Sequence, residues 1–101
     1  MYKLSYLQFA KKDLEAITDY IVDTLKAPKA AFDFIDSVED GINRLCELPF
    51  SCRVYKPIKP VDLEYRVLTI KNYLIFYIVL DDTVEIHRIV YGRRNLSQLI
   101  K

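Results

Sequence analysis

The sequence predicts an α+β domain in which a short N-terminal strand is followed by an antiparallel helix hairpin packed on a C-terminal antiparallel β-meander. Two stretches with a helical repeat of apolar residues meet at Ala27-Pro28, and three β-rich runs with two-residue links follow in the second half. A chain of 101 residues has the usual size of one domain and buries about two thirds of its extended surface on folding. We therefore expect a single domain over residues 1–101.

The first half of the chain predicts one strand and two helices. Tyr2 to Tyr6 alternates apolar and polar residues, which is typical of a short strand at a sheet edge. From Gln8 to Leu25 apolar residues recur every three or four positions, which predicts an amphipathic helix. Pro28 interrupts this pattern and suits the first turn of a second helix, whose apolar repeat ends near Leu48-Pro49. Because the link is so short, the two helices are expected to form an antiparallel hairpin.

The second half predicts the sheet. Pro57 and Pro60 exclude the segment after Arg53 from a central strand, so we expect a loop or an edge segment there. Three β-rich runs follow: Leu63 to Ile70, Tyr73 to Leu80 and Thr83 to Tyr91. Their links, Lys71-Asn72 and Asp81-Asp82, are short enough to join antiparallel neighbours. The middle run is apolar at almost every position, which predicts a central strand covered on both faces.

Several classes of protein are disfavoured by the composition. The longest apolar run, Tyr73 to Leu80, has eight residues, whereas a membrane-spanning helix needs about twenty. The N-terminus has no export signal, so the chain is expected in the cytoplasm without a membrane partner. Cys46 and Cys52 are predicted to be reduced, partly buried thiols. Nucleotide-binding loops, a serine-hydrolase elbow and metal-ligand spacings are also absent, so we expect no cofactor and no metal.

Charge divides along the chain. Residues 1–52 hold six Lys/Arg and nine Asp/Glu, net −3, and residues 53–101 hold nine and five, net +4, so a polyanion is expected to contact the second half. Guanidinium groups suit bidentate contacts with phosphate, and tyrosines can stack on bases, although such residues often serve only solvation or packing. The candidate binding residues are Arg66, Lys71, Tyr91, Arg93 and Arg94.

His87 and Arg88 are candidate catalytic residues in the last strand. His87 is the only histidine in the sequence, so imidazole chemistry near neutral pH would require it, although a lone histidine is often structural. Strict alternation along the strand separates His87 from Arg88. It places Arg88 on an otherwise apolar face with Val84, Ile86 and Val90. A bulged strand or a carboxylate partner would explain this placement of Arg88.

Three segments carry a family resemblance. They are Glu64-Tyr65-Arg66-Val67, Lys71-Asn72-Tyr73-Leu74-Ile75-Phe76-Tyr77 and Val84-Glu85-Ile86-His87-Arg88-Ile89-Val90-Tyr91-Gly92-Arg93-Arg94. In this order and spacing they resemble the RelE/ParE toxins of bacterial type II toxin–antitoxin modules. Further similar segments extend the resemblance over nearly the whole chain: Asp13-Leu14, Asp19-Tyr20-Ile21 and Leu48-Pro49. The resemblance implies a RelE/ParE-like fold with a helix hairpin against an antiparallel sheet, in agreement with the periodicity.

The resemblance also implies a growth-inhibiting toxin whose partner is a cognate antitoxin, which adds a helix or strand to exposed apolar surface. Two targets stay open: ParE-like members poison DNA gyrase, whereas RelE-like members cut ribosome-bound mRNA without a metal. Leu74 and Ile100 stand where RelE proteins carry an arginine and a tyrosine. These losses favour gyrase.

A RelE-like ribonuclease is the alternative hypothesis, and it would need a variant site built from His87, Arg88 and Arg94, of which Arg94 matches a RelE arginine. A third hypothesis is a toxin-like fold that binds an antitoxin and has lost its toxicity. The resemblance alone does not decide whether the protein is an enzyme.

Overall fold

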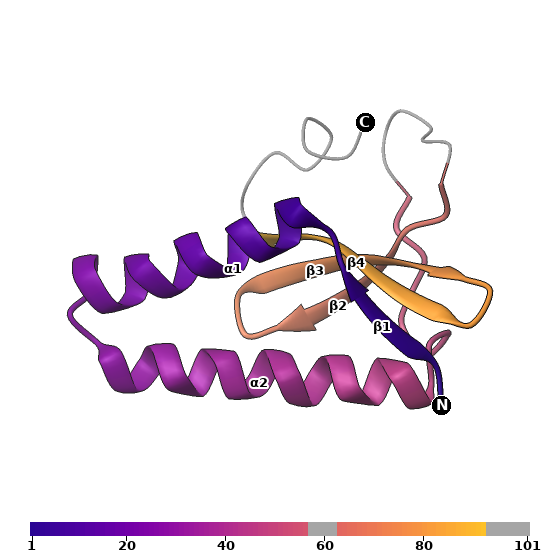
Figure 1. The fold of residues 1–101 in the computed structure, drawn as a ribbon. Coiled ribbons are helices and arrows are strands. Elements are labelled where there is room, and N and C mark those ends of the chain that lie inside the picture. Colours follow the sequence, from indigo (N-terminus) through magenta and orange to yellow (C-terminus); the bar gives the residue numbers. More distant parts are fainter. Residues whose placement is uncertain (57–62, 93–101) are drawn as a thin grey trace.

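The computed structural model describes residues 1–56 and 63–92, whose arrangement is shown in Figure 1. The elements follow in the order β1 (Lys3–Tyr6), α1 (Gln8–Asp19), the π-helical turn η1 (Tyr20–Thr24), α2 (Pro28–Glu47), β2 (Arg66–Ile70), β3 (Tyr73–Leu80) and β4 (Thr83–Tyr91). The predicted order of strand, helix hairpin and meander is confirmed. Strand β2 begins three residues after the predicted start at Leu63, and the predicted edge segment makes one isolated bridge, between Val54 and Arg66. Its prolines, Pro57 and Pro60, lie outside the described residues.

The four strands form one mixed sheet in the order β1-β4-β3-β2. The pairs β2–β3 and β3–β4 are antiparallel, as the two tight links predict, and β3 lies between its two neighbours. Strand β1 pairs in parallel with the first half of β4, from Lys3↔Thr83 to Tyr6↔Ile86. A parallel pair needs a long crossover connection. Here the connection from β1 to β4 contains the helix hairpin, β2 and β3. β1 is therefore an edge strand, as predicted.

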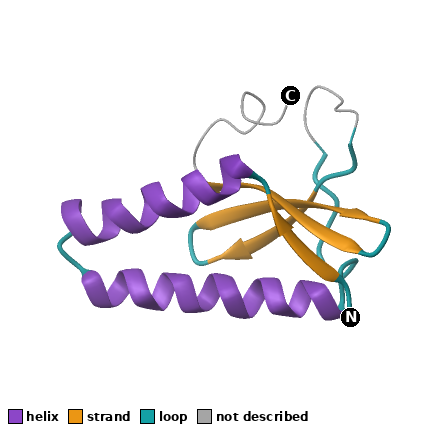
Figure 2. Ribbon diagram, in the orientation of Figure 1, coloured by secondary structure: helices purple, strands orange, loops and turns teal. Residues whose placement is uncertain are grey.

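Helices α1 and α2 run side by side and pack against the sheet (Figure 2). Pro28 stands in the first turn of α2, where its missing N–H costs nothing. The inward stripe of α2 is buried: Ala31, Phe34, Val38, Gly41, Ile42, Leu45 and Cys46. Gly41 allows close helix–sheet contact, because a Cβ there would lie 2.8 Å from Ile70 Cδ1. The same core includes Ile75, Tyr77, Val84, Ile86 and Ile89 from the sheet.

A smaller apolar cluster lies on the other face of the sheet. Val67, Phe76 and Val90 are its buried residues, and Tyr55 packs its ring edge-on against Phe76 with centroids 5.0 Å apart. Side chains alternate along a strand, so Phe76 points away from the helices that its neighbour Tyr77 contacts. Tyr55, in the segment that follows α2, therefore packs on the face of the sheet opposite the helices.

Strand β4 contains a β-bulge. Phe76 pairs with Arg88, but the next residue of β3, Tyr77, pairs with Ile86, so His87 has no partner across the ladder. An extra residue of this kind bends the strand and re-aims the side chains beside it. The bulge is one of the two explanations that the sequence allows for Arg88.

Because of the bulge, side chains do not alternate strictly along β4 as the sequence suggests. Ile86 and Ile89, which alternation would place on opposite faces, both belong to the core under the helices. Val90, which alternation would place with Ile86, belongs to the cluster on the far face. The predicted grouping is therefore wrong beyond His87, because one inserted residue reverses the parity of all that follow.

Cys46 is buried and Cys52 is half-buried, and both thiols are free, as predicted. Among the helices of residues 1–56 and 63–92, none combines the length and the apolar character that a bilayer crossing requires.

Tyr77 connects the core to the end of α2, and its buried phenol is expected to make the free energy of unfolding depend on pH in the alkaline range. Its hydroxyl, buried completely, donates to the carbonyl of Pro49 at 2.8 Å. Burial raises the pKa of Tyr77 strongly above its ordinary value, and burial also raises the pKa of Tyr6, Tyr65 and Tyr73. Tyrosines of the unfolded chain lose their protons near about pH 10, so above that pH the unfolded chain binds fewer protons than the fold. The free energy of unfolding is therefore expected to fall.

Tyr77→Phe tests this expectation. The substitution should make the alkaline loss of stability less steep, because one raised pKa is removed, and it should cost about 1 kcal/mol at neutral pH through the lost hydrogen bond. Urea unfolding between about pH 7 and pH 11 measures both effects, with Tyr20→Phe, which removes a half-exposed phenol, as the control. The same slope in wild type and Tyr77→Phe would contradict the assignment.

Candidate functional site

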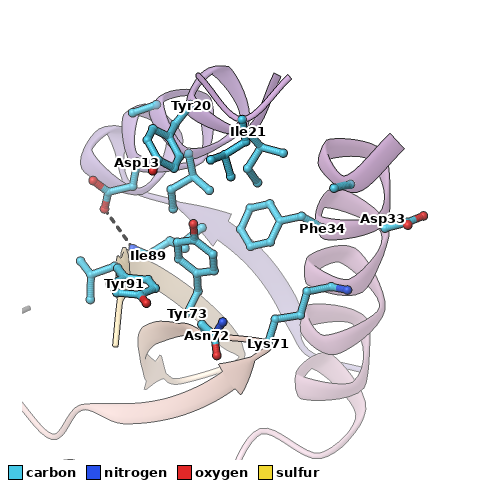
Figure 3. Close-up of a pocket in the computed structure, with 15 residues that line it drawn as sticks. Asp13, Tyr20, Ile21, Asp33, Phe34, Lys71, Asn72, Tyr73, Ile89 and Tyr91 are labelled. Carbon is cyan, nitrogen blue, oxygen red and sulfur yellow. Dashed lines mark hydrogen bonds between the residues drawn. The ribbon is translucent and has the colours of Figure 1, made fainter. Parts of the chain in front are cut away.

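An open groove of about 800 Å³ lies between the helix hairpin and the end of the sheet where β2 turns into β3 (Figure 3). Helices α1 and α2 with η1 form one side, and the Lys71-Asn72 link with the end of β4 forms the other. Most of its lining is apolar: Ala16, Ile17, Ile21, Leu25, Ala30, Phe34, Ile89 and Val90. A concave, mainly apolar site with a few polar groups is the usual character of a binding site.

The π-helical turn η1 forms part of the groove wall. The sequence predicts one continuous helix from Gln8 to Leu25, and the structure widens its last turn, where the N–H of Leu25 donates to the carbonyl of Tyr20 at 3.1 Å. Lys26 then adopts a left-handed conformation, with φ of 54°, which ends the helix. Turns of this type are rare and occur often at functional sites. Here the turn brings Tyr20 and Ile21 to the groove.

Aromatic rings in tilted and edge-on contact form the centre of the groove. The ring of Tyr73 lies between Phe34, at a centroid distance of 4.9 Å, and Tyr91, at 5.7 Å. Burial raises the pKa of Tyr73, and the neighbouring phenols of Tyr20 and Tyr91 raise it further. Three hydroxyl groups therefore border an apolar floor, so the groove suits a ligand that combines apolar side chains with hydrogen-bonding groups.

Lys71 and Tyr91, two of the predicted binding residues, lie at this groove. Lys71 opens the β2–β3 link with φ of 54°, and Tyr91 ends β4 with 38% of its surface exposed. The N–H of Gly92 donates to the carbonyl of Asn72 at 2.9 Å, which holds the end of β4 against the link. A Cβ on Gly92 would lie 3.3 Å from the same oxygen, so glycine suits this close approach.

Arg66 lies away from the groove. Its guanidinium donates to the carbonyls of Cys52, at 2.7 Å, and Phe50, at 3.3 Å, and it lies 5.0 Å from the centroid of the Phe50 ring. These contacts fasten the segment after α2 to the start of β2. A phosphate would have to compete with them for the guanidinium. Arg93 and Arg94, the remaining predicted binding residues, lie outside the described residues.

Arg88 reaches a carboxylate, which is the second explanation that the sequence allows. Its Nε donates to Asp13 Oδ2 at 2.7 Å and its Nη2 to Oδ1 at 3.1 Å, while the N–H of Ile89 donates to Oδ2 at 2.9 Å. Strand β1 pairs with β4 only as far as Ile86, so Asp13 accepts a hydrogen bond that a longer β1 would have taken.

The pair between Asp13 and Arg88 fastens α1 to β4 at the edge of the groove. The hydrogen bond to Asp13 raises the pKa of Arg88 above its ordinary value, despite partial burial, so the guanidinium stays charged. Both side chains are largely buried, with 24% of Arg88 and 17% of Asp13 exposed. This geometry gives Arg88 a structural role, and a catalytic role would require the pair to open.

His87 joins a second polar cluster, outside the groove. Its Nε2 lies 2.7 Å from Glu85 Oε1, and its Nδ1 lies 2.9 Å from the hydroxyl of Tyr65. The side chains of His87 and Glu85 are 11% and 23% exposed. The structure thus separates two of the predicted catalytic residues, because His87 and Arg88 have different partners. The third, Arg94, lies outside the described residues.

Three polar residues of these clusters are absent from the sequence-based candidates. Asp13 has a sequence signal, because the odd position of Arg88 requires a carboxylate partner. Glu85 also has one, because it lies two residues before His87 on the same strand face. Tyr65 has none, because only the folded sheet brings it to a residue 22 positions away. Among the described residues, no group of His, Cys, Asp and Glu is placed to hold a metal ion.

Comparisons with known proteins give the family. A family model described as "ParE toxin of type II toxin-antitoxin system, parDE" matches residues 4–96. Eleven chains of known structure match, including one described as the chromosomal ParDE TA system from P. aeruginosa, with 22% sequence identity, a TM-score of 0.71, and coverage of 90% of this chain and 96% of that chain. At this identity the structural likeness shows the fold alone, and no curated protein matches. The family model spans nearly the whole sequence, so the chain belongs to the ParE toxin family of type II toxin–antitoxin systems.

Proposed function

We propose that this protein is a growth-inhibiting cytoplasmic toxin that poisons DNA gyrase and is neutralised by a cognate antitoxin. The match of the ParE family model to residues 4–96 carries the proposal. The position of Leu74 supports it, because this residue stands where the resemblance to RelE proteins would require an arginine. Leu74 packs against the apolar cluster of Val67, Phe76 and Val90. An apolar side chain that belongs to this cluster therefore stands where RelE proteins carry a cation.

The groove between the helix hairpin and the sheet is the proposed antitoxin site. Its floor is apolar, and its borders carry the phenols of Tyr20, Tyr73 and Tyr91 together with Lys71 and Asp33. An amphipathic segment of the antitoxin would place apolar side chains on the floor and polar ones on the border. The groove, with a volume of about 800 Å³, accommodates several side chains of such a segment.

Expression without an antitoxin tests the function. Induction should stop growth, and incorporation of labelled thymidine should fall within minutes and before incorporation of labelled methionine, because blocked gyrase halts replication first. Co-expression of the antitoxin should restore growth. Unchanged growth while folded protein accumulates would leave only the hypothesis of a non-toxic antitoxin-binding protein.

Arg93 and Arg94 are proposed to contact the target, because they follow β4 after one residue, Gly92, in the half of the chain that carries a net charge of +4. The double substitution Arg93→Ala/Arg94→Ala is expected to relieve toxicity at equal expression without changing the thermal unfolding midpoint. Lys11→Ala/Lys12→Ala removes the same charge from the exposed face of α1 and should remain toxic. Persistent toxicity of the arginine double variant would exclude both residues from the target contact.

A further inference from the structure

Lys71 has a backbone conformation that is strained for a lysine. It is the first residue of the two-residue link between β2 and β3, and its φ of 54° lies in the left-handed region. A Cβ in that region crowds the carbonyl oxygen that follows, so glycine, asparagine or aspartate is favoured there. The chain thus retains a lysine where a less strained residue would make the same turn.

Two other described residues share this conformation, and neither lies at the groove. Asp81, with φ of 51°, begins the link between β3 and β4, and aspartate is among the residues that tolerate a positive φ. Lys26, with φ of 54°, follows the end of η1, where a left-handed residue commonly ends a helix. Of the three, Lys71 alone lines the groove. Strained backbone is characteristic of functional sites, and at Lys71 it coincides with the proposed binding site.

The charge of Lys71 is unpaired at the border of the groove. Among the residues that the structure describes, no carboxylate lies within ion-pair distance of its ammonium. Two acidic residues line the same groove, and one of them, Asp13, is already paired with Arg88. Figure 3 shows the carboxylate of the other, Asp33, directed away from the groove. The ammonium of Lys71 is therefore available to a bound partner.

The link that carries Lys71 is held firmly in place. The N–H of Gly92 donates to the carbonyl of Asn72 at 2.9 Å, which joins the link to the end of β4. The next residue, Tyr73, packs its ring against Phe34 and Tyr91. A charge on a backbone that is already ordered binds an opposite charge with a smaller loss of conformational entropy. The backbone around Lys71 is thus preorganised for recognition.

We propose that Lys71 is a specificity-determining residue for the antitoxin, and that its ammonium binds a carboxylate of the antitoxin segment in the groove. This inference rests on the proposed function, because it assumes that the groove receives the antitoxin. It adds that the segment carries an acidic side chain beside the apolar side chains that cover the floor. A segment without this acid would cover the ammonium and leave it unpaired, so Lys71 disfavours segments that match the apolar floor alone.

Lys71→Gly is expected to change stability and binding in opposite directions. Relief of the left-handed strain outweighs the backbone entropy that glycine adds to the unfolded chain, so the thermal unfolding midpoint should rise by about 3 °C. Affinity for the antitoxin should fall about 10-fold, because the charge pair is lost. Lys26→Gly is the matched control, with the same φ and a place outside the groove, and it should raise the midpoint without weakening binding.

Lys71→Gln separates the charge from the backbone, since it removes the ammonium and keeps a side chain of similar length. The binding partner in the test is the full-length antitoxin, separated from its complex with the wild-type toxin, and calorimetric titration measures its affinity at about 50 and 300 mM salt. Lys71→Gln should bind about 10-fold more weakly than wild type at the lower salt concentration and show a smaller salt dependence. Lys71→Arg should restore the affinity, and Lys26→Gln should bind as wild type does.

Equal affinities of wild type and Lys71→Gln at both salt concentrations would overturn the proposal, and so would an equal loss of affinity in Lys26→Gln. Loss of gyrase inhibition by Lys71→Gln with unchanged antitoxin affinity would also overturn it and assign Lys71 to the target contact. Absence of binding between the antitoxin and the folded wild-type toxin would reject the antitoxin partnership together with this inference. The failure of Lys71 alone is therefore distinguishable from the failure of the proposed function.

Discussion

Asp13→Ala is expected to lower the free energy of unfolding by about 3 kcal/mol, because it leaves the largely buried guanidinium of Arg88 without its partner. The N–H of Ile89 loses its acceptor in the same substitution. Asp13→Asn keeps one acceptor oxygen but removes the charge, so its cost should be intermediate. Urea unfolding measures both, and Asp19→Ala, at an exposed position of the same helix, is the matched control.

A double-mutant cycle separates the pair from its surroundings. Arg88→Met in the Asp13→Ala background should recover part of the lost stability, because the uncompensated charge is then gone. Equal stability of Asp13→Ala and Asp19→Ala would contradict the role assigned to the pair. The cycle also reports on the groove, since Asp13 lies at its edge and the pair sets where α1 meets β4.

Ala16→Glu is expected to weaken antitoxin binding at least about 100-fold and to leave the folded toxin intact. Ala16 is an exposed residue of α1 that lines the apolar groove, so a docked segment would cover the new carboxylate without a partner for it. A cost of about 3 kcal/mol for an unpaired, desolvated charge corresponds to this loss of affinity. Calorimetric titration of the antitoxin measures the affinity, and growth assays should show that Ala16→Glu escapes neutralisation.

The matched control is Gln8→Glu, which adds the same charge to α1 at an exposed position outside the groove. This variant should bind the antitoxin as wild type does. Wild-type affinity of Ala16→Glu would place the antitoxin elsewhere on the toxin while leaving the family assignment unaffected.

The elements of the fold could be predicted because local pattern and tertiary packing agree in them. The apolar stripe of α2, the proline at its first turn and the two-residue links around β3 each determine structure over a few residues, and β3 and β4 lie where the pattern places them. The π-helical turn η1 and the bulge at His87 could not be predicted, because each adds or shifts one residue inside an otherwise regular pattern.

The candidate residues were harder to predict than the elements, because a side chain's role depends on partners distant in sequence. Lys71 and Tyr91 meet at one groove because the strand ends meet there. Arg88 donates a hydrogen bond to Asp13, 75 positions earlier, and His87 is hydrogen-bonded to Tyr65, 22 positions earlier. The position of Arg88 on an otherwise apolar strand face predicts a carboxylate partner but does not identify it. A sequence pattern thus locates chemically notable residues without showing which contact each one makes.

Incubation of the purified protein with purified DNA gyrase, ATP and supercoiled plasmid tests the central proposal most directly. We expect linear DNA to accumulate after detergent and protease treatment, only when both proteins are present, and its formation to be prevented by the antitoxin. Normal gyrase turnover without trapped DNA breaks, at a concentration of folded toxin that stops growth in cells, would contradict gyrase poisoning.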